Sequence, residues 1–408
     1  MIVRRIKPEE LKRTNELFAI AFEYEIDNTK TAEQVYEEVL ANPQSREDAY
    51  WSHRWAAFLD DNQTMTSYFV AKPYPVHFDN HPCTFTGIGG VASLPQYRRM
   101  GGIRKCFEAA LPEMYGNGYE FSYLYPFSTA YYRKFGYELC CEKLRYQIKL
   151  NTIPSFPIEG SCFLLEKGSS YLEDIKQVYQ NWQNKYNMMV INEDYEYAWV
   201  ETSNPAKDQN FTYIYKDPIG TPKGFITFHK VNHDTTRNLN CSRLMFTDIE
   251  GFKGLMNLVR SLSSDHEFIT FELPTDQYIA SLFPEWSMGA GKKELIPSGM
   301  VRVINVEKVL TMAQYKGDGN IVIEVTDAFI PQNNNRFNIH YQDNKALFVE
   351  TTKESPHISL GIQDFSRFIT GACDTAEIPF MESVQIFTTL DKIAPVFYKK
   401  PLLITEYF

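Results

Sequence analysis

The sequence lacks the patterns that mark metal-binding, disulfide-rich and membrane-spanning proteins. Its 7 cysteines are odd in number and show no C-x-x-C spacing, so we expect reduced thiols rather than a disulfide framework or a zinc site. The 8 histidines are scattered, and none lies in H-E-x-x-H or a similar ligand spacing, so we predict no bound metal. Runs of about 18 apolar residues are absent too, as are low-complexity segments.

Charge and the start of the chain narrow the class of protein further. The formal net charge of −10 makes nucleic acid and anionic membranes poor partners and a cationic small molecule a favourable one. The first residues, MIVRRIKPEEL, carry charges where a signal peptide needs an apolar core, so we expect a cytoplasmic protein. With 408 residues, 44% hydrophobic and 15% aromatic, the chain can build roughly two to four packed domains.

One stretch, Gly87 to Ile103 (GIGGVASLPQYRRMGGI), combines a strand, a basic loop and the start of a helix. Isoleucine, valine and glycine before Leu94-Pro95 indicate a strand whose backbone a ligand can approach closely. The loop that follows joins Arg98 and Arg99 to two glycines, and apolar residues then recur at helical spacing. Open N–H groups at a helix N-terminus, together with glycine and arginine, favour a site for a diphosphate. The simpler alternative is a solvated turn between a strand and a helix.

Three motifs along the chain resemble one enzyme superfamily. The loop matches Gln/Arg-x-x-Gly-x-Gly/Ala, the acyl-CoA signature of the GNAT acetyltransferases, through Arg98 and Gly101, with Ile103 where a small residue is usual. Further on come Tyr131-Tyr132-Arg133-Lys134-Phe135-Gly136-Tyr137 and the final Glu406-Tyr407-Phe408. Together they resemble the Eis (enhanced intracellular survival) branch of that superfamily, in which an Arg-Arg-x-Gly-x-aliphatic loop is usual. The resemblance covers the whole chain.

The resemblance implies an α/β (α+β) fold class: tandem GNAT folds, with mixed, mostly antiparallel central sheets flanked by helices, followed by a sterol-carrier-protein-like α/β domain. The expected domains are a catalytic GNAT acetyltransferase domain in residues 1–150, a degenerate second GNAT-like domain in residues 151–291, and a sterol-carrier-protein-like domain in residues 292–408 that ends in the active site. A homo-oligomer, specifically a hexamer, is implied as well.

Acetyl-CoA is the implied co-substrate. In the GNAT fold the two central strands splay apart and acyl-CoA lies between them, which places Val91 and Ser93 at the splay, with backbone groups that pair with the pantetheine arm as an added strand does. The expected acetyl-CoA-binding residues are Val91, Ala92, Ser93, Arg98, Arg99, Met100, Gly101, Gly102 and Ile103.

The order of elements read from the residues agrees with this fold. An apolar face at helical spacing predicts a helix that begins after Pro8-Glu9-Glu10 and includes Leu11 to Phe22. Alternating apolar runs predict strands at residues 55–59, 67–78, 84–91 and 120–125.

The second part of the chain reads as an altered copy of the first. A helix around 171–182 and a hairpin of 211–215 with 224–230 precede another strand-to-helix passage, residues 245–252. Here Asp248 and Glu250 stand where the first copy has arginines, and carboxylates repel a diphosphate. We therefore expect a single active site. After residue 290 the pattern predicts strands at 321–325, 336–341 and 346–351 and a helix at 364–369 that Asp364 caps.

Acetyl transfer to an amine needs few catalytic groups. Tyr132 begins Tyr-x-x-Phe-Gly-Tyr and so aligns with the family's general acid, which protonates the departing thiolate. The base that the resemblance implies is the C-terminal carboxylate, here of Phe408, acting directly or through a water, with Glu25 and Glu406 as alternatives. Phe22, Glu25 and Glu406 are the expected substrate-binding residues. The bland alternatives are that Tyr131, Tyr132 and Tyr137 are simply core aromatic residues and that Glu25 lies at a solvated helix end.

The leading functional hypothesis is an acetyl-CoA-dependent N-acetyltransferase acting on a primary amine of aminoglycoside-like, polyamine-like or lysine-like type. One alternative is a lipid or sterol carrier with a vestigial acetyltransferase half. Another is a CoA-sensing regulator that binds the cofactor without turnover. Cys106, on the apolar face of the helix after the basic loop, is expected to be a buried, inert thiol rather than a nucleophile.

Overall fold

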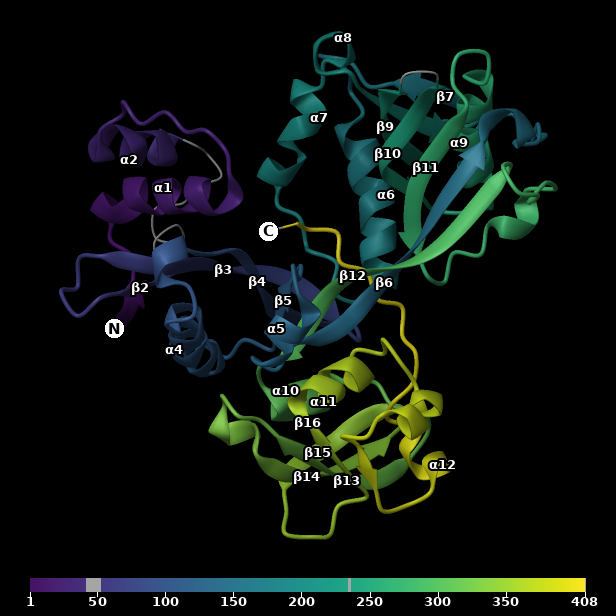
Figure 1. Cartoon of the computed structure of the whole chain (residues 1–408). Coiled ribbons are helices and arrows are strands. Elements are labelled where there is room, and N and C mark those ends of the chain that lie inside the picture. The colour runs from purple at the N-terminus through teal and green to yellow at the C-terminus, as the bar shows by residue number, and fades with distance from the viewer. Residues whose placement is uncertain (42–52, 234–235, 408) are drawn as a thin grey trace. The chain divides into compact units, whose positions relative to one another are not determined.

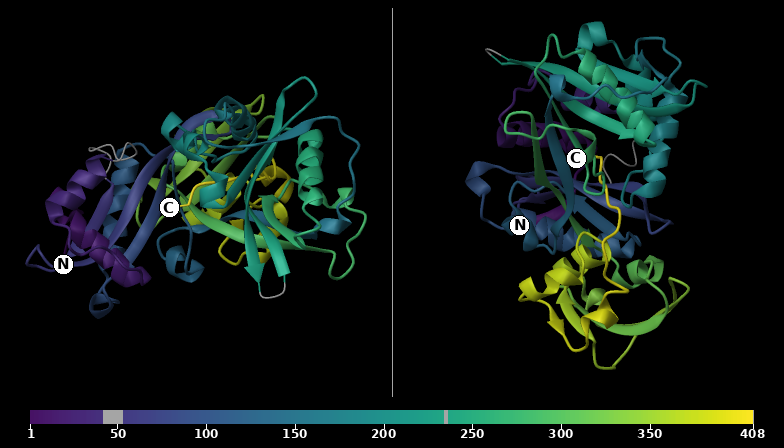
Figure 2. Two further views of the ribbon diagram at one scale, coloured as in Figure 1. Left: turned by 90° about the horizontal axis from the view of Figure 1, so that it is seen from above. Right: turned by 90° about the vertical axis from the view of Figure 1, so that its right-hand side faces the viewer.

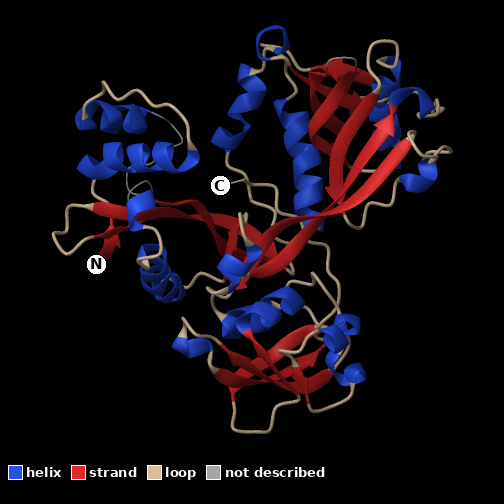
Figure 3. Cartoon of the chain, in the orientation of Figure 1, coloured by secondary structure: helices blue, strands red, loops and turns tan. Residues whose placement is uncertain are grey.

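The computed structural model describes residues 1–41, 53–233 and 236–407. The chain divides into two compact units: the first contains residues 1–141, 187–191 and 299–408, and the second contains residues 142–186 and 192–298. Strands β6 (Glu138–Lys149) and β12 (Gly291–Val303) each include one of these boundaries. Figures 1 and 2 colour the chain by residue number, and Figure 3 separates helices from strands.

The amino-terminal part of the first unit is a sheet with helices on both faces. The strand order is β1-β2-β3-β4-β5-β12, and every neighbouring pair is antiparallel except β4 and β5. Alternation along the strands sends Ala57 and Phe69 into the core under α4, and Ala56 and Tyr68 into the core under α1. The elements are β1 (Ile2–Arg5), α1 (Leu11–Phe22), α2 (Ala32–Ala41), β2 (Arg54–Phe58), β3 (Met65–Phe78), β4 (His81–Ser93), α4 (Gly102–Gly116), β5 (Phe121–Leu124) and α5 (Thr129–Arg133), with one-turn helices η1 (Pro8–Glu10) and η2 (Pro95–Tyr97).

The carboxy-terminal part of the first unit is built on a five-stranded sheet of order β15-β14-β13-β16-β17. Its core is continuous with that of the amino-terminal part, because one cluster of buried side chains contains Phe85 and Phe121 together with Ile323 and Phe365. The elements are α10 (Val306–Met312), β13 (Gly319–Thr326), η6 (Pro331–Asn333), β14 (Asn335–Gln342), β15 (Lys345–Thr351), β16 (Ile358–Gly361), α11 (Ile362–Ile369), η7 (Thr375–Phe380), β17 (Gln385–Ile386) and α12 (Leu390–Ile393).

The second unit has a sheet of strand order β6-β11-β10-β9-β8-β7, and β10 and β11 are its one parallel pair among the described residues. Its elements are η3 (Leu150–Thr152), β7 (Ser161–Leu164), α6 (Leu172–Lys185), η4 (Asp194–Tyr197), α7 (Ala198–Thr202), α8 (Pro205–Asp208), β8 (Asn210–Lys216), β9 (Pro222–His233), β10 (Thr236–Phe246), α9 (Ile249–Ser261), β11 (Phe268–Pro274) and η5 (Ala280–Leu282).

Each unit contains the same strand, helix and parallel-strand motif, β4-α4-β5 in the first and β10-α9-β11 in the second. In both, the strand before the helix carries an irregularity in its antiparallel pairing, between Gly89 and Ala92 in β4 and between Cys241 and Arg243 in β10. The shared motif and the shared irregularity support the interpretation of an internal repeat.

The predicted strands and the first helix are confirmed within a few residues, and the α/β class of tandem sheets with a separate carboxy-terminal sheet is confirmed too. One boundary was wrong. Helix α11 begins at Ile362, and Gly361 at the end of β16 is its N-cap, so Asp364 lies inside the first turn rather than at the cap. The domain boundaries at residues 150 and 291 stay a prediction. Among the described residues, no helix is long and apolar enough to cross a membrane.

Candidate acetyl-transfer site

The two central strands of the first unit separate beyond Ile88. Strands β4 and β5 pair in parallel from Phe85 to Ile88, and β4 then continues to Ser93 alongside β3. Gly90 lies at the bulge with φ of 59°, and a Cβ atom there would approach Phe18 Cε2 to 2.9 Å, so only glycine fits without strain. The backbone from Gly89 to Ser93, which includes Val91 and Ala92, is thus the stretch of this strand that an extended ligand can pair with.

The loop after β4 presents two arginines and an open helix N-terminus. Arg98 and Arg99 are exposed and form no ion pair within the described part of the chain. Arg99, with φ of 65°, and Gly101, with φ of 85°, both have left-handed backbone. Gly101 is the N-cap of α4, and within the described part of the chain no side chain caps the N-terminus of this 15-residue helix. Exposed cations and unsatisfied N–H groups together form a site for an anion.

The remaining loop residues divide between solvent and core. Met100 is 52% exposed, whereas Gly102 is buried and Ile103 packs with its side chain in the core under α4. The side chain of Ile103 therefore serves packing, and the part it can offer a ligand is its backbone N–H.

Tyr132 lies on the short helix α5, whose N-cap Ser128 accepts a hydrogen bond from the backbone N–H of Tyr131 at 3.3 Å. Tyr132 is 2% exposed and packs edge-on against Phe127 and Tyr131, with ring centroids 5.3 and 5.2 Å away. Burial, and then the neighbouring Tyr131 and Tyr137, raise the pKa of Tyr132 above its ordinary value, so the phenol stays protonated at neutral pH. No hydrogen bond to its hydroxyl occurs among the described residues.

Tyr137 differs from Tyr132 because its hydroxyl is engaged. It lies 2.6 Å from Ser122 Oγ, and both side chains are fully buried. Tyr131 is half-buried and packs on Phe135. Tyr137 is thus a core residue, as the bland alternative predicted, whereas Tyr132 keeps an uncommitted hydroxyl.

The carboxy-terminal segment reaches the end of β5. Backbone hydrogen bonds tie it to Asn187, which donates to the carbonyl of Pro401 at 3.0 Å and accepts from Leu403 at 3.1 Å. The ring of Tyr407 then stacks on Tyr125, with centroids 4.2 Å apart and planes 10° apart. Tyr125 follows directly after β5, so the last described residue lies beside the strand that separates from β4. Phe408 itself lies outside the described residues.

A cavity of about 340 Å³ opens on the α1 face of the sheet, at the glycine-rich part of β4. Its aromatic wall comes from α1 and β3, and its floor comes from the glycines that precede the bulge. The lining residues are Thr14, Asn15, Phe18, Tyr24, Arg54, Tyr68, Val70, Lys72, Tyr74, Gly87, Gly89 and Gly90.

The charge of this cavity is positive. Lys72 and Arg54 line it, whereas no aspartate or glutamate does so within the described ranges. Lys72 Nζ lies 4.8 Å from the ring centroid of Tyr74, and Arg54 donates to the hydroxyl of Tyr68. Burial, followed by the charges of Arg5, Lys72 and Arg54, lowers the pKa of nearby His53 to about 4. Burial is the larger cause of this depressed pKa, and the neighbouring cationic charges add to it.

None of the three predicted substrate-binding residues is among the described residues that line this cavity. Phe22 is exposed at the end of α1, with its ring 4.5 Å from that of Phe18 in the cavity wall. Glu25 is exposed and does not line the cavity. Glu406 is partly buried and accepts a hydrogen bond from Thr405 Oγ1 at 3.2 Å. Sequence patterns did not indicate the pocket-lining Arg54 and Lys72, because alternation along a strand does not reveal which face a ligand occupies.

Other candidate groups are structural. Cys106 is fully buried, and burial raises its pKa to about 12, so the thiol is inert as expected. In the second unit, Asp248 caps α9 by accepting from the N–H of Gly251 at 2.9 Å, and its carboxylate pairs with Lys223 at 2.9 Å. The position that is open in the first unit is therefore filled here by a carboxylate. The described residues contain no group of three or more histidine, cysteine, aspartate or glutamate side chains that could hold a metal ion.

Comparisons with known proteins agree with this geometry. Residues 2–140 match the family model of the acetyltransferase (GNAT) domain, and residues 306–401 match that of the sterol carrier protein domain. No curated protein sequence matches the chain.

Solved structures share the fold over the full length of the chain. A conserved protein from Enterococcus faecalis, described as a probable N-acyltransferase, is 21% identical with a TM-score of 0.82, covering 100% of this chain and 99% of that one. Eis1 from Mycobacterium abscessus is 16% identical with a TM-score of 0.79 and full coverage of both chains. A GCN5-related N-acetyltransferase from Anabaena variabilis is 15% identical with a TM-score of 0.83, again over both chains in full. The chain therefore contains a GNAT acetyltransferase domain in residues 2–140 and a sterol carrier protein domain in residues 306–401, and it shares its overall fold with these solved structures.

Proposed function

We propose that the protein transfers an acetyl group from acetyl-CoA to a primary amine by direct attack. The observation that carries this proposal is the separation of β4 from β5 directly before an uncapped helix N-terminus with two exposed arginines. The bulged β4 backbone suits an extended pantetheine arm, and Arg98, Arg99 and the first turn of α4 suit a diphosphate. The residues present thus fit the pantetheine arm and the diphosphate of acetyl-CoA.

The chemistry assigned to the chain's own residues is a proton transfer at each end of the reaction. As the amine nitrogen bonds to the thioester carbon and the carbon–sulfur bond breaks, the hydroxyl of Tyr132 gives its proton to the departing sulfur. Its raised pKa means that the phenol carries this proton at neutral pH. The proton lost by the amine goes to the C-terminal carboxylate of Phe408, directly or through a water. The stacking of Tyr407 on Tyr125 supports this second assignment, because it brings the chain end to the separating strands.

The acceptor pocket is the cavity on the α1 face. Of the three expected acceptor types, the lysine-like one fits best, because its carboxylate is complementary to the cationic lining of the cavity at Lys72. Aminoglycosides and polyamines carry several positive charges, which the same lining repels. The aromatic side chains of Phe18, Tyr24 and Tyr74 suit the apolar stem of such an acceptor.

The test measures acetyl-CoA turnover with a panel of lysine-like, polyamine and aminoglycoside amines, and the release of free thiol is the readout. If none of these amines is acetylated although CoA binds tightly, the protein is a CoA-sensing regulator. If CoA does not bind, it is a carrier protein.

Lys72→Met is expected to raise the KM of a lysine-like acceptor about tenfold, because one charge-assisted contact is lost, while leaving the KM of a polyamine unchanged or lower. Lys105→Met is the matched control, because Lys105 is an exposed lysine on α4. Equal effects of both variants would rule out a contact between the acceptor and Lys72. Light scattering tests the proposed homo-oligomer, a hexamer by family resemblance.

A further inference from the structure

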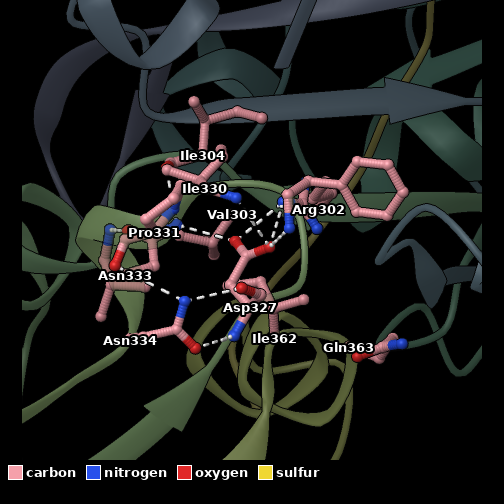
Figure 4. A network of polar contacts seen from close by, with 12 residues as sticks. Arg302, Val303, Ile304, Asp327, Ile330, Pro331, Asn333, Asn334, Ile362 and Gln363 are labelled. Atoms are coloured by element: carbon pink, nitrogen blue, oxygen red, sulfur yellow. Dashed lines mark hydrogen bonds and ion pairs between the residues drawn. The ribbon is translucent and has the colours of Figure 1, made fainter. Parts of the chain in front are cut away.

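A buried ion pair lies beneath the turn that follows Tyr132. Arg302 on β12 and Asp327 after β13 both have side chains that are 0% exposed. Arg302 Nη2 donates to both carboxylate oxygens of Asp327 at 2.7 Å, as Figure 4 shows. Few side chains of this polarity are so completely removed from water, and a pair of this kind is held by further contacts.

Asp327 is fully supported by its own part of the chain. Its carboxylate accepts from the N–H groups of Phe329 at 2.9 Å and Ile330 at 3.2 Å, and from Asn333 Nδ2 at 2.9 Å. Asn334 holds the backbone, since its Oδ1 accepts from the Asp327 N–H at 2.8 Å and its Nδ2 donates to the Asp327 carbonyl at 2.6 Å (Figure 4). The carboxylate that orients Arg302 is therefore fixed in place.

Arg302, in contrast, is only partly satisfied. Its Nε and Nη1 atoms are buried and have no hydrogen-bond partner among the described residues. Instead, the guanidinium packs against the backbone of Gly136, where an added Cβ atom would overlap Nη1. A guanidinium with unmade hydrogen bonds lowers stability, and a buried ion pair is commonly no more stable than an apolar pair of similar size. Stability of the fold therefore does not explain why an arginine occupies position 302.

The carboxy-terminal part of the unit contacts the same turn at other points. Gln363 Nε2 donates to the carbonyl oxygen of Arg133 at 3.1 Å, and the ring of Phe329 packs edge-on against Phe135 at 5.9 Å. Phe135 stacks in turn on Phe107 of α4, with centroids 4.3 Å apart. Residues 133–136, the turn directly after Tyr132, are thus held between α4 and the carboxy-terminal part.

We propose that Arg302 is a positioning residue for Tyr132, and that the carboxy-terminal sterol-carrier-type part is the support of the catalytic turn. The planar guanidinium, which Asp327 orients, lies against Gly136 and fixes the position of residues 133–136. The position of this turn sets the direction of the Tyr132 hydroxyl. This inference rests on the proposed role of Tyr132 as the acid. It gives the carboxy-terminal part a function in acetyl transfer that requires no lipid.

The test replaces both charges at once, so that no unpaired charge is left buried. The double variant Arg302→Met, Asp327→Leu is expected to melt below the parent, because the N–H groups of Phe329 and Ile330 and Asn333 Nδ2 lose their acceptor, but to remain folded and to bind CoA within about twofold of the parent. Its kcat is expected to fall about 10- to 100-fold, the usual cost of moving a reacting group by about 1 Å. Arg336→Met, Glu324→Leu is the matched control, because this partly exposed pair at 2.7 Å joins β14 to β13. The control is expected to keep the parent kcat.

A second background shows whether the pair acts through Tyr132. In Tyr132→Phe protein, the Arg302→Met, Asp327→Leu change is expected to lower kcat less than about threefold further, because the acid it positions is already gone. An undiminished further loss, or a parent-like kcat in the well-folded double variant, overturns the inference. Full activity of Tyr132→Phe alone instead overturns the proposed acid.

Gln363→Ala decides the question if the buried double variant does not fold. It removes one hydrogen bond to the turn at a solvent-accessible site and is expected to lower kcat about 3- to 10-fold at unchanged CoA affinity. A parent-like kcat for this variant overturns the inference as well.

Discussion

Removing both arginines of the loop after β4 tests the proposed diphosphate site most directly. Arg98 and Arg99 are exposed and form no ion pair within the described chain, so the double variant Arg98→Ala, Arg99→Ala breaks no internal contact of this kind. Its free energy of unfolding is expected to stay within about 0.5 kcal/mol of the parent value, as for other surface changes. Any loss of CoA binding can then be assigned to the ligand contacts themselves.

The expected loss follows from the number of charge-assisted hydrogen bonds. Each arginine contributes about 1.5–3 kcal/mol to a fully formed contact with phosphate, and partial exposure to solvent reduces the sum to about 2–4 kcal/mol. At about 1.4 kcal/mol per factor of ten, the Kd for CoA is expected to rise about 30- to 700-fold. Added salt is expected to weaken binding to the parent more than binding to the variant, because exposed charges are screened.

Isothermal titration calorimetry with CoA measures both quantities. Arg13→Ala is the matched control, because Arg13 is an exposed arginine on α1, away from the loop, and is paired with Glu16 at 2.8 Å. This control is expected to change Kd less than about threefold, in keeping with a surface ion pair. If the Arg98→Ala, Arg99→Ala protein binds CoA as tightly as the parent, the loop is a solvated turn and the proposed site is wrong.

Three further predictions concern the catalytic groups. Tyr132→Phe is expected to keep CoA affinity but lower kcat about 10²- to 10⁴-fold, while Tyr131→Phe changes it less than about threefold; the reverse ranking would place the acid one residue earlier. Since burial raises the pKa of Tyr132 above the ordinary value of about 10, its phenol stays protonated as pH rises, and kcat is expected to show no alkaline decline with a midpoint below about pH 9. Residues appended after Phe408 are expected to abolish turnover at unchanged melting temperature, whereas the same tag before Met1 has no effect; equal kcat for both would exclude the terminal carboxylate as base.

Local sequence patterns predicted much of the first unit. The strands were found because their apolar residues alternate, and the glycines of β4 indicated a backbone that a ligand can approach closely. The start of α11 was misjudged because β16 passes into the helix without a loop, so Gly361 takes the cap position that Asp364 had suggested. The helix begins two residues earlier than predicted because Ile362 is buried there, so packing rather than capping determines where α11 starts.

The polar contacts beneath the catalytic turn were beyond such patterns. Arg302 stands alone in the apolar run Met300 to Ile304, which is a signal that a charge is buried and paired. Its partner Asp327 lies 25 positions later and the turn at Gly136 lies far earlier in the chain, so only the fold brings them together. A single sequence therefore points to the arginine but not to its function.

The net charge of the chain and the residues that line the proposed acceptor pocket favour different kinds of substrate. A formal charge of −10 for the whole chain predicted a cationic acceptor. The field inside a partly enclosed cavity, however, is set by charges within about 8–10 Å, since salt screens those further away. There Lys72 and Arg54 lie among aromatic side chains, and their charges add to the effect of burial in lowering the pKa of nearby His53. An acceptor whose amine reaches the separating strands while its own carboxylate meets Lys72 satisfies both the chemistry of transfer and the charge of the pocket.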